Sequence, residues 1–193
     1  MCRIAVVGPD GSGKSTLLEK IASALPDLKV VRMPELRHRN GISENAAALQ
    51  AIVTLTPYLI RTFLRGGGIT LFERCAAIDF QVYGKVYGKI GRLLGEYISS
   101  VAPLPSHVLY LDIDIATALS RISKDKHQHH ETPERMGIII ERYQGVLNRL
   151  VEKSLIELHE INARAEPDKV YHDAMNIIGP LYEHSKKCQR KIC

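Results

Sequence analysis

Residues 4–16 read Ile-Ala-Val-Val-Gly-Pro-Asp-Gly-Ser-Gly-Lys-Ser-Thr, which places the pattern G-x-x-x-x-G-K-S directly after a short apolar run. Glycine adopts backbone angles that are closed to residues with a Cβ, so successive N–H groups of such a loop can turn inward around phosphate oxygens. The N-terminus of the following helix directs its partial positive charge to the same place. The stretch predicts a strand, a loop that binds an anionic polyphosphate, and a helix. The alternative is an ordinary glycine-rich turn that happens to carry a lysine.

Two side chains of this loop suit ATP and Mg²⁺. The ammonium group of Lys14 supplies a charge for the β- and γ-phosphates, and the hydroxyl of Ser15 suits a Mg²⁺ ligand. We therefore expect ATP and Mg²⁺ as cofactors. The predicted ATP-binding residues of the loop are Gly8, Pro9, Asp10, Gly11, Ser12, Gly13, Lys14, Ser15 and Thr16.

The composition is typical of one globular domain. The chain has 193 residues, of which 45% are hydrophobic and 24% are charged. No apolar run approaches the roughly 18 residues of a membrane span, and the first residues predict a strand rather than a signal peptide. The four cysteines lack C-x-x-C spacing and indicate reduced thiols. We expect a cytoplasmic protein with no membrane contact.

The net charge of +5 is concentrated near the C-terminus. We expect residues 186–193 to form a basic, solvated tail after a single domain at 1–185, in preference to a tail that binds nucleic acid. The remaining excess of basic residues suits polyanionic substrates.

Strands and helices alternate along the chain. Apolar runs predict strands at 3–7, 28–32, 69–72, 107–113 and 155–163. Apolar residues spaced three and four apart predict helices at 14–25, about 44–65, 76–100, 115–122, from 133 onward and 167–183. This order predicts a three-layer α/β domain with a five-stranded parallel sheet flanked by helices.

Ligands of such sheets bind beyond the carboxyl ends of the strands. Gly8, Pro34, Glu73 and Asp112 lie at those ends, so we expect them to gather at one edge. There, the carboxylate of Glu73 could orient Mg²⁺ or its waters, and the guanidinium of Arg74 could clamp a phosphate. The alternative for this pair is a surface ion pair that caps the next helix.

Other polar residues near this edge give weaker signals. After Arg32-Met-Pro-Glu35, the basic loop of Arg37, His38 and Arg39 could hold the phosphate of an acceptor, although a charged run is usually a solvated turn. Asp112 and Asp114 could bind a metal, but we favour Asp114 as the N-cap of the next helix.

A polar loop at about 123–133 predicts a short lid that closes over the phosphates. Its histidines could instead bind a metal, but no cysteine or carboxylate pattern accompanies them. The cations and histidines in or beside this loop are Arg121, Lys124, Lys126, His127, His129 and His130.

With these segments in order, the chain resembles the thymidylate kinases, a family of P-loop nucleoside monophosphate kinases, over nearly its whole length. The resemblance is carried by residues 8–16, Arg32-Met-Pro-Glu35, Glu73-Arg74, the segment 111–121 and Ile161-Asn-Ala163. It implies the P-loop NTPase fold, transfer of the ATP γ-phosphate to a deoxynucleoside monophosphate such as dTMP, and a homodimer.

The resemblance also implies roles for individual residues. Asp10 stands at the family's acidic position that meets the sugar 3′-hydroxyl of the acceptor. Lys14, Glu73 and Arg74 would be catalytic, with Ser15, and Glu73 through water, at the Mg²⁺. The acceptor-binding residues would be Asp10, Arg32, Glu35, Arg37, Arg61 and Arg74, while Arg121 would contact ATP and Lys124 and Lys126 would belong to the lid.

Three positions depart from the family pattern. Glu73 replaces aspartate, Cys75 replaces the usual tyrosine, and Ile78 stands where a serine or threonine near the base is expected. Glu73-Arg74-Cys75 and Pro34-Glu35 also resemble deoxynucleoside kinases, in which the glutamate after the second strand takes a proton from the sugar 5′-hydroxyl. Asp10 favours the monophosphate acceptor. A protein that binds nucleotide without turnover is a third interpretation.

Overall fold

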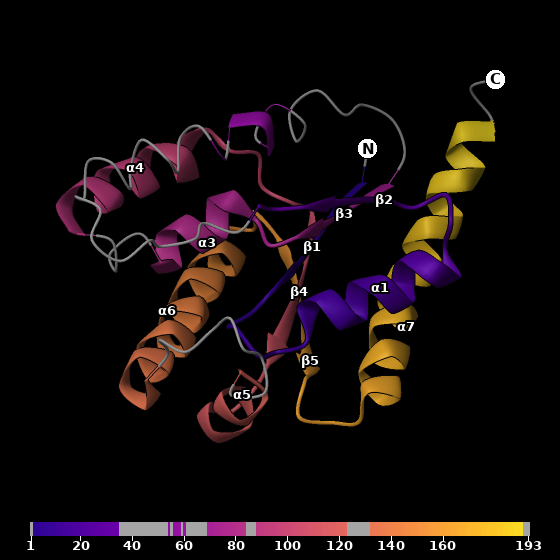
Figure 1. The fold of residues 1–193 in the computed structure, drawn as a ribbon. Coiled ribbons are helices and arrows are strands. Elements are labelled where there is room, and N and C mark those ends of the chain that lie inside the picture. The colour runs from indigo at the N-terminus through magenta and orange to yellow at the C-terminus, as the bar shows by residue number, and fades with distance from the viewer. Residues whose placement is uncertain are drawn as a thin grey trace.

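Five strands form one parallel sheet in the computed structural model, which describes residues 2–34, 54, 56–58, 60, 69–83, 88–122 and 132–190 (Figure 1). The strands are β1 (Cys2–Val7), β2 (Lys29–Arg32), β3 (Ile69–Glu73), β4 (His107–Asp112) and β5 (Glu157–Asn162). Their order is β2-β3-β1-β4-β5, which places β1 at the centre and makes β2 and β5 the edges.

The register of β1 and β3 brings the predicted site together. Both faces of β1 are covered, and for this reason its residues 4–7 are all apolar and fully buried. Glu73, the last residue of β3, pairs with Val6 of β1, two residues before the glycine-rich loop begins at Gly8. The end of β3 and this loop are therefore neighbours.

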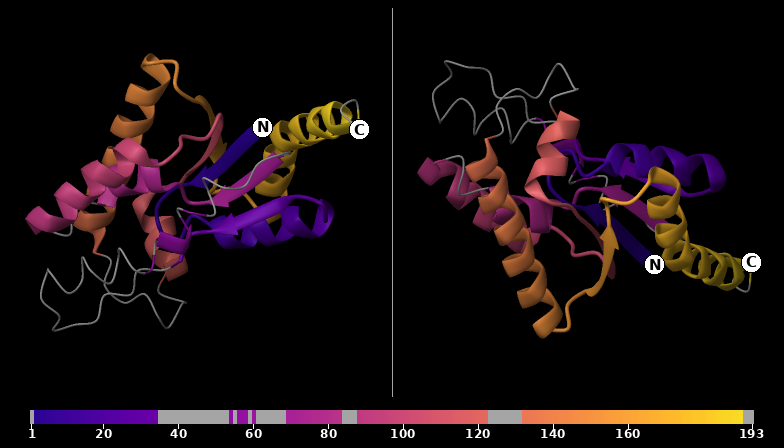
Figure 2. Two further views of the ribbon diagram at one scale, coloured as in Figure 1. Left: turned by 90° about the horizontal axis from the view of Figure 1, so that it is seen from above. Right: turned by 90° about the horizontal axis from the view of Figure 1, so that it is seen from below.

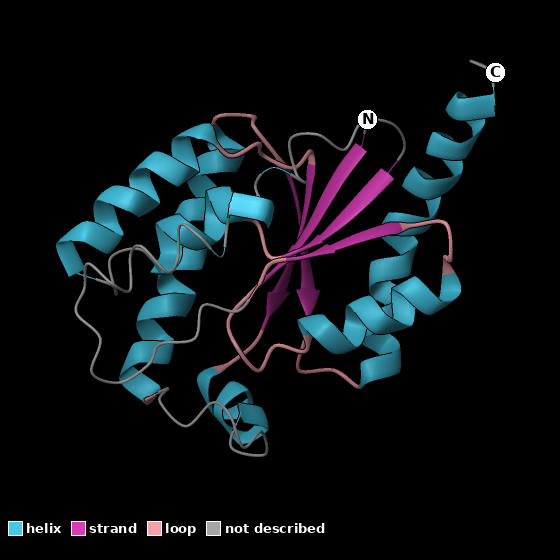
Figure 3. Cartoon of the chain, turned by 45° about the horizontal axis from the view of Figure 1, so that its top comes forward, coloured by secondary structure: helices cyan, strands magenta, loops and turns pink. Residues whose placement is uncertain are grey.

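Helices cover both faces of the sheet (Figures 2 and 3). The described helices are α1 (Lys14–Ala24), α3 (Ala76–Tyr83), α4 (Gly88–Val101), α5 (Ile115–Ile122), α6 (Pro133–Glu152) and α7 (Pro167–Arg190). Helices α1 and α7 lie on one face, and α3 and α6 lie on the other with α4 packed against α3. Helix α6 begins with Pro133 after the N-cap Thr132, whose side chain accepts a hydrogen bond from the backbone N–H of Arg135.

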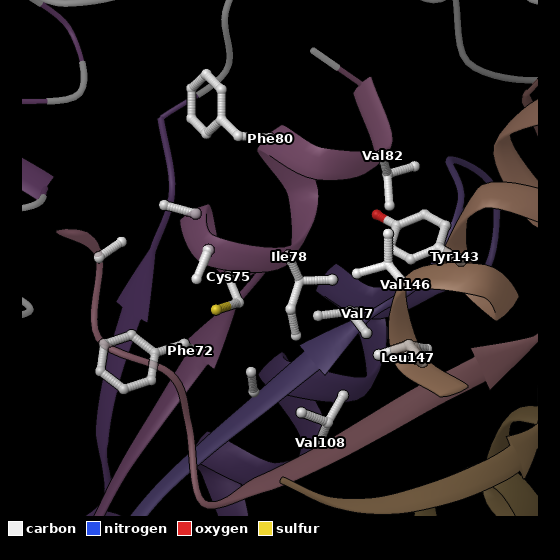
Figure 4. Close-up of a cluster of buried hydrophobic side chains, with 14 of the residues drawn as sticks. Val7, Phe72, Cys75, Ile78, Phe80, Val82, Val108, Tyr143, Val146 and Leu147 are labelled. Carbon is white, nitrogen blue, oxygen red and sulfur yellow. The ribbon is translucent and has the colours of Figure 1, made fainter. Parts of the chain in front are cut away.

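Each layer of helices buries its own hydrophobic core. The core beneath α3 and α6, part of which is shown in Figure 4, includes Val7, Phe72, Ile78, Val108, Tyr143 and Leu147. The core beneath α1 and α7 includes Leu18, Ile21, Leu71, Leu109, Ile161 and Ile178. Alternate residues of the central strands contribute to opposite cores, as the period of two in a strand requires.

The five predicted strands are confirmed, with ends that differ by no more than two residues. The predicted helix at 76–100 is two helices, α3 and α4. Most of the predicted helix at 44–65 and of the lid at 123–133 lies outside the described residues. No described helix combines the length and the apolar character that crossing a membrane would require.

The expected end of the last helix is wrong. Helix α7 continues to Arg190, beyond the predicted end at residue 183, so residues 186–190 are helical. Within this part of the helix, Lys186 Nζ is 3.1 Å from a carboxylate oxygen of Asp27 and 4.5 Å from the ring centre of Tyr182.

Candidate active site

The glycine-rich loop, residues 8–13, joins the end of β1 to the start of α1, as predicted. Gly11 has a φ of +79°, and a Cβ at this position would lie 2.5 Å from the carbonyl oxygen of Ala118 in α5. Gly13 has a φ of +87° and is the N-cap of α1. Both positions require glycine, the first because of strain and crowding and the second because of strain alone.

Lys14 is folded back onto this loop. Its side chain is only 6% exposed, and its Nζ donates hydrogen bonds to the carbonyl oxygens of Gly8 at 2.9 Å and Pro9 at 2.7 Å. Burial and the neighbouring charge of Arg74 lower the pKa of Lys14 to about 8. The loop thus holds a cation whose charge is sensitive to mildly alkaline pH.

Ser15 and Glu73 meet between α1 and the end of β3. The Ser15 hydroxyl donates a hydrogen bond of 2.6 Å to Glu73 Oε1. Arg32 Nε lies 3.5 Å from the other carboxylate oxygen, Oε2 of Glu73. Hydroxyl and carboxylate oxygens are the donors that Mg²⁺ prefers, so this pair fits the predicted metal ligands.

Asp10 and Arg74 form an ion pair beside Lys14. Arg74 Nη2 donates to Asp10 Oδ1, and Lys14 Nζ lies 3.9 Å from the same oxygen. Burial raises the pKa of Asp10, but the charges of Arg74 and Lys14 outweigh burial and hold this pKa below its usual value. Asp10 is therefore a carboxylate and a weak base.

The backbone of Arg74 is strained. Its φ is +66°, which is uncommon for a residue with a side chain. The Arg74 N–H donates to the carbonyl oxygen of Val6 at 3.0 Å, and the Tyr58 hydroxyl donates to the Arg74 carbonyl oxygen at 3.3 Å. The guanidinium carbon lies 5.6 Å from the ring centre of Tyr83. These contacts hold Arg74 in the conformation in which it reaches Asp10.

Asp79 of α3 is a site residue that the sequence analysis missed. Its side chain is 2% exposed, and it accepts hydrogen bonds from the backbone N–H of Cys75 at 2.6 Å and the hydroxyl of Tyr143 at 2.6 Å. Arg74 Nη1 donates to Asp79 Oδ1 at 3.3 Å, so the guanidinium is held between two carboxylates. A lone acidic residue in the apolar run 75–80 is the sequence signal that could have identified it.

Two departures from the family pattern face the core. Ile78 is fully buried and lies close to Val7, as Figure 4 shows. Cys75 is also buried, and burial together with the charge of Asp79 raises the pKa of its thiol to about 12. Ile78 has no hydrogen-bonding group, and the Cys75 thiol lies within the core.

The remaining described candidates lie at the same end of the sheet. Asp114 is the predicted cap of α5, because its Oδ1 accepts a hydrogen bond of 2.8 Å from the backbone N–H of Thr117. Asp112 is 3.9 Å from Arg164. Arg121 donates to the carbonyl oxygen of Ala163 at 3.0 Å and thus ties α5 to the end of β5. The candidates that lie outside the described residues are Glu35, Arg37, Arg61, Lys124 and Lys126.

Known proteins resemble this chain in sequence or in fold. No protein-family model matches the chain. A protein of Pyrobaculum calidifontis named probable thymidylate kinase is 33% identical over 155 residues, which cover 72% of this chain and 79% of that relative.

Two solved structures share the P-loop NTPase fold. Deoxyadenosine kinase from M. mycoides, with products dCMP and a flexible dCDP bound, has a TM-score of 0.71 and 18% identity, and covers 92% of this chain and 98% of its own. Thymidylate kinase from Candida albicans has a TM-score of 0.66 and 19% identity, and covers 93% of this chain and 91% of its own.

Proposed function

Because this chain belongs to the thymidylate kinase family, we propose that it transfers the γ-phosphate of ATP to the phosphate of a deoxynucleoside monophosphate, with thymidylate as the preferred acceptor. Such a reaction needs a site that binds two polyanions side by side and aligns them for in-line transfer. The described site supplies cations for both.

The ion pair of Asp10 and Arg74 beside Lys14 is the observation that carries this proposal. An arginine can exchange a carboxylate for a phosphate, because both present two oxygens to its planar fork. An acceptor phosphate would take the Arg74 Nη2 group, while Asp79 would keep its hold on Nη1. The released carboxylate of Asp10 would then be free to accept a hydrogen bond from a sugar hydroxyl.

The protonation state of Asp10 fits a role in binding the acceptor rather than in taking a proton from it. A monophosphate is already an anion, whereas a hydroxyl must lose a proton to a base during the reaction. The lowered pKa of Asp10 makes it unsuited to that task. Lys14 and Arg74 would neutralise charge on the phosphates, and the protein would contribute through position and electrostatics.

Ser15 and Glu73 would hold Mg²⁺. Their oxygens are in contact at 2.6 Å, between α1 and the end of β3, and both are oxygen donors of the kind that Mg²⁺ selects. When bound, Mg²⁺ supplies charge neutralisation and orientation of the β- and γ-phosphates.

Further parts of the proposal come from the family resemblance. Residues 123–133, with Lys124 and Lys126, would form a lid of the domain at 1–185, and Arg121 beside them would contact ATP. The protein would act in the cytoplasm as a homodimer.

A second candidate function is phosphorylation of a nucleoside 5′-hydroxyl. The segments Glu73-Arg74-Cys75 and Pro34-Glu35, which resemble those of deoxynucleoside kinases, favour it. The burial of Ile78 agrees with this function, because the position expected to carry a hydroxyl near thymine lies in the core. In that reaction, Glu35 would be the base.

An assay that couples ADP formation to NADH oxidation separates the two functions. We expect turnover with dTMP, weaker turnover with dUMP and other monophosphates, and none with thymidine, deoxyadenosine or deoxycytidine. The Lys14→Ala variant, matched for expression and thermal unfolding, should be inactive with every acceptor. Turnover with a nucleoside alone would replace the first function with the second, and near-normal turnover of Lys14→Ala would contradict both.

A further inference from the structure

Three side chains with metal-ligating atoms converge at the end of the sheet away from the glycine-rich loop. They are His107, Glu157 and His159, which we call the β4–β5 histidine cluster. His107 and Glu157 are the first residues of neighbouring strands and pair with each other in the register. The glycine-rich loop and Glu73, by contrast, lie where strands end. The cluster is thus separate from the proposed Mg²⁺ site.

Regular strands position all three side chains. Residues two apart on a strand point to the same side, so Glu157 and His159 share one face of β5, and His107 lies opposite Glu157 on β4. Further along the strands this face continues into Leu109 and Ile161, which belong to the core beneath α1 and α7. The side chains therefore converge from a rigid backbone.

The distances within the cluster match those of a zinc-type site. His107 Nδ1 lies 3.3 Å from His159 Nε2. The Glu157 carboxylate faces both nitrogens, with Oε2 3.4 Å from His107 Nδ1 and Oε1 3.4 Å from His159 Nε2. In a tetrahedral site with bonds of about 2.0–2.1 Å, the ligand atoms stand about 3.3–3.4 Å apart. The two rings are nearly parallel, with an interplanar angle of 24°.

Hydrogen bonds alone account less well for this geometry. All three separations are longer than the roughly 2.9–3.0 Å that is commonest for N–H···O bonds. Each hydrogen bond also joins one donor to one acceptor, whereas each ring nitrogen here faces two other ligand groups. A cation among the three groups would satisfy all of them at once.

We propose that the β4–β5 histidine cluster binds a divalent transition metal of the zinc type. The protein ligands are His107 Nδ1, His159 Nε2 and the carboxylate of Glu157, whose two oxygens each face one of the nitrogens, and water completes the site. Glu157 is 63% exposed, which leaves the position of this water open to solvent. Imidazole with carboxylate selects such a metal over Mg²⁺. The metal links β4 to the edge strand β5 and stabilises the folded protein, because the unfolded chain lacks a preformed site.

The unmodified protein provides the first test. After dialysis against EDTA, titration with Co²⁺ is expected to produce the intense visible absorption of tetrahedral cobalt, saturating at one equivalent. Zn²⁺ should abolish this absorption, whereas millimolar Mg²⁺ should leave it unchanged. Zn²⁺ should also raise the melting temperature. Weak octahedral absorption alone would overturn the proposal.

Ligand variants provide the second test. His159→Gln and Glu157→Gln should each lower the affinity for Zn²⁺ by more than the roughly 10–100-fold that loss of an outer-shell partner causes. Their melting temperatures in EDTA report whether they fold. Wild-type affinity in a folded His159→Gln variant would overturn the proposal.

Two control variants exclude other histidines. One replaces His127, His129 and His130 with glutamine, and the other is His184→Gln, which removes the ring 3.6 Å from the Cys188 sulfur. Both controls should keep the affinity and the cobalt spectrum of the wild type. Loss of the spectrum in either control would assign the metal to that histidine group and overturn the proposal.

Discussion

At the scale of single residues, Arg74 connects the parts of the site. Its guanidinium contacts Asp10 from the glycine-rich loop and Asp79 from α3. In this position its backbone has a strained, positive φ. Burial lowers the pKa of Arg74, but Asp10 and the other nearby groups outweigh this effect and hold the pKa well above its usual value. Arg74 is therefore a permanent cation, and Asp79 acts through it as a positioning residue.

Replacement of Asp79 tests this positioning role. Asp79→Asn removes the charge that orients Arg74, and a hydrogen bond to a charged group contributes about 1.5–3 kcal/mol. We expect KM for the acceptor to rise about tenfold or more, while KM for ATP changes less than about twofold. Steady-state kinetics with each substrate varied in turn measures this split.

Two further variants control for a general loss of structure. Tyr143→Phe removes one of the bonds that hold Asp79 and should raise the acceptor KM in the same direction but less. Asp173→Asn, at a surface pair with Lys169, should change neither KM. Equal increases of both KM values in Asp79→Asn would contradict a positioning role.

The pKa of Lys14 predicts how nucleotide binding depends on pH. Below pH 8 the nucleotide-free protein carries a charged Lys14, and above it the charge is progressively lost. Bound phosphates favour the charged form of Lys14, so the pKa of Lys14 is higher in the complex with ATP than in the free protein. The affinity for ATP must therefore fall as pH rises beyond about 8. We expect ATP affinity to decrease by up to about tenfold per pH unit there, as measured by calorimetry from pH 7 to 9.5.

Ionisation of the phosphates does not change over this pH range, because the second pKa of a phosphate group is about 6. Lys14→Met should bind ATP weakly and without this decline. An affinity of the wild type that stays constant up to pH 9.5 would show that Lys14 does not contact the phosphates.

At the scale of elements, the glycine-rich loop is held against α5 as well as between β1 and α1. The closest atom to a Cβ at Gly11 belongs to the backbone of Ala118, whereas a Cβ at Gly13 would meet nothing within 4 Å. A side chain would therefore meet backbone strain at both glycines, but steric crowding only at Gly11. Helix α5 in turn is capped by Asp114 and tied to the end of β5 by Arg121.

Alanine at these two glycines should destabilise the protein to different degrees. Gly13→Ala adds only left-handed strain, for which we expect a loss of about 1–2 kcal/mol in the free energy of unfolding. Gly11→Ala adds crowding against α5, for a total loss of about 2–4 kcal/mol. Urea unfolding without nucleotide measures both, and equal losses would show that the loop does not rest on α5.

At the scale of the whole molecule, the outer helix α4 presents an apolar stripe. Leu93, Tyr97 and Val101 are four residues apart and are 62%, 66% and 42% exposed. Such a stripe fits burial against a second copy of the chain, because a C₂ contact pairs the same patch on both subunits. We propose this stripe of α4 as the interface between the two subunits of the homodimer.

A charge on this stripe should separate the subunits. We expect Tyr97→Glu to convert a dimer into a monomer in light scattering coupled to gel filtration. Ile138→Glu alters another exposed apolar residue, 46% exposed and on α6, and should leave the dimer intact. A dimer that survives Tyr97→Glu would place the interface elsewhere.

The local pattern of the sequence was sufficient for the order of the elements. The strand, loop and helix around residues 4–16 follow from contiguous residues, and the ends of helix α5 follow from Asp114 and its apolar periodicity. The proximity of Ser15 to Glu73 was also predictable, because the carboxyl ends of parallel strands share one edge.

Contacts between distant segments were decided only by the tertiary structure. The hydrogen bond from Tyr143 to Asp79 depends on how α3 packs against α6. The β4–β5 histidine cluster depends on the register of two strands 50 residues apart in the chain. Local patterns report which face of an element is apolar, whereas register and packing are set by the summed burial of many residues from other elements.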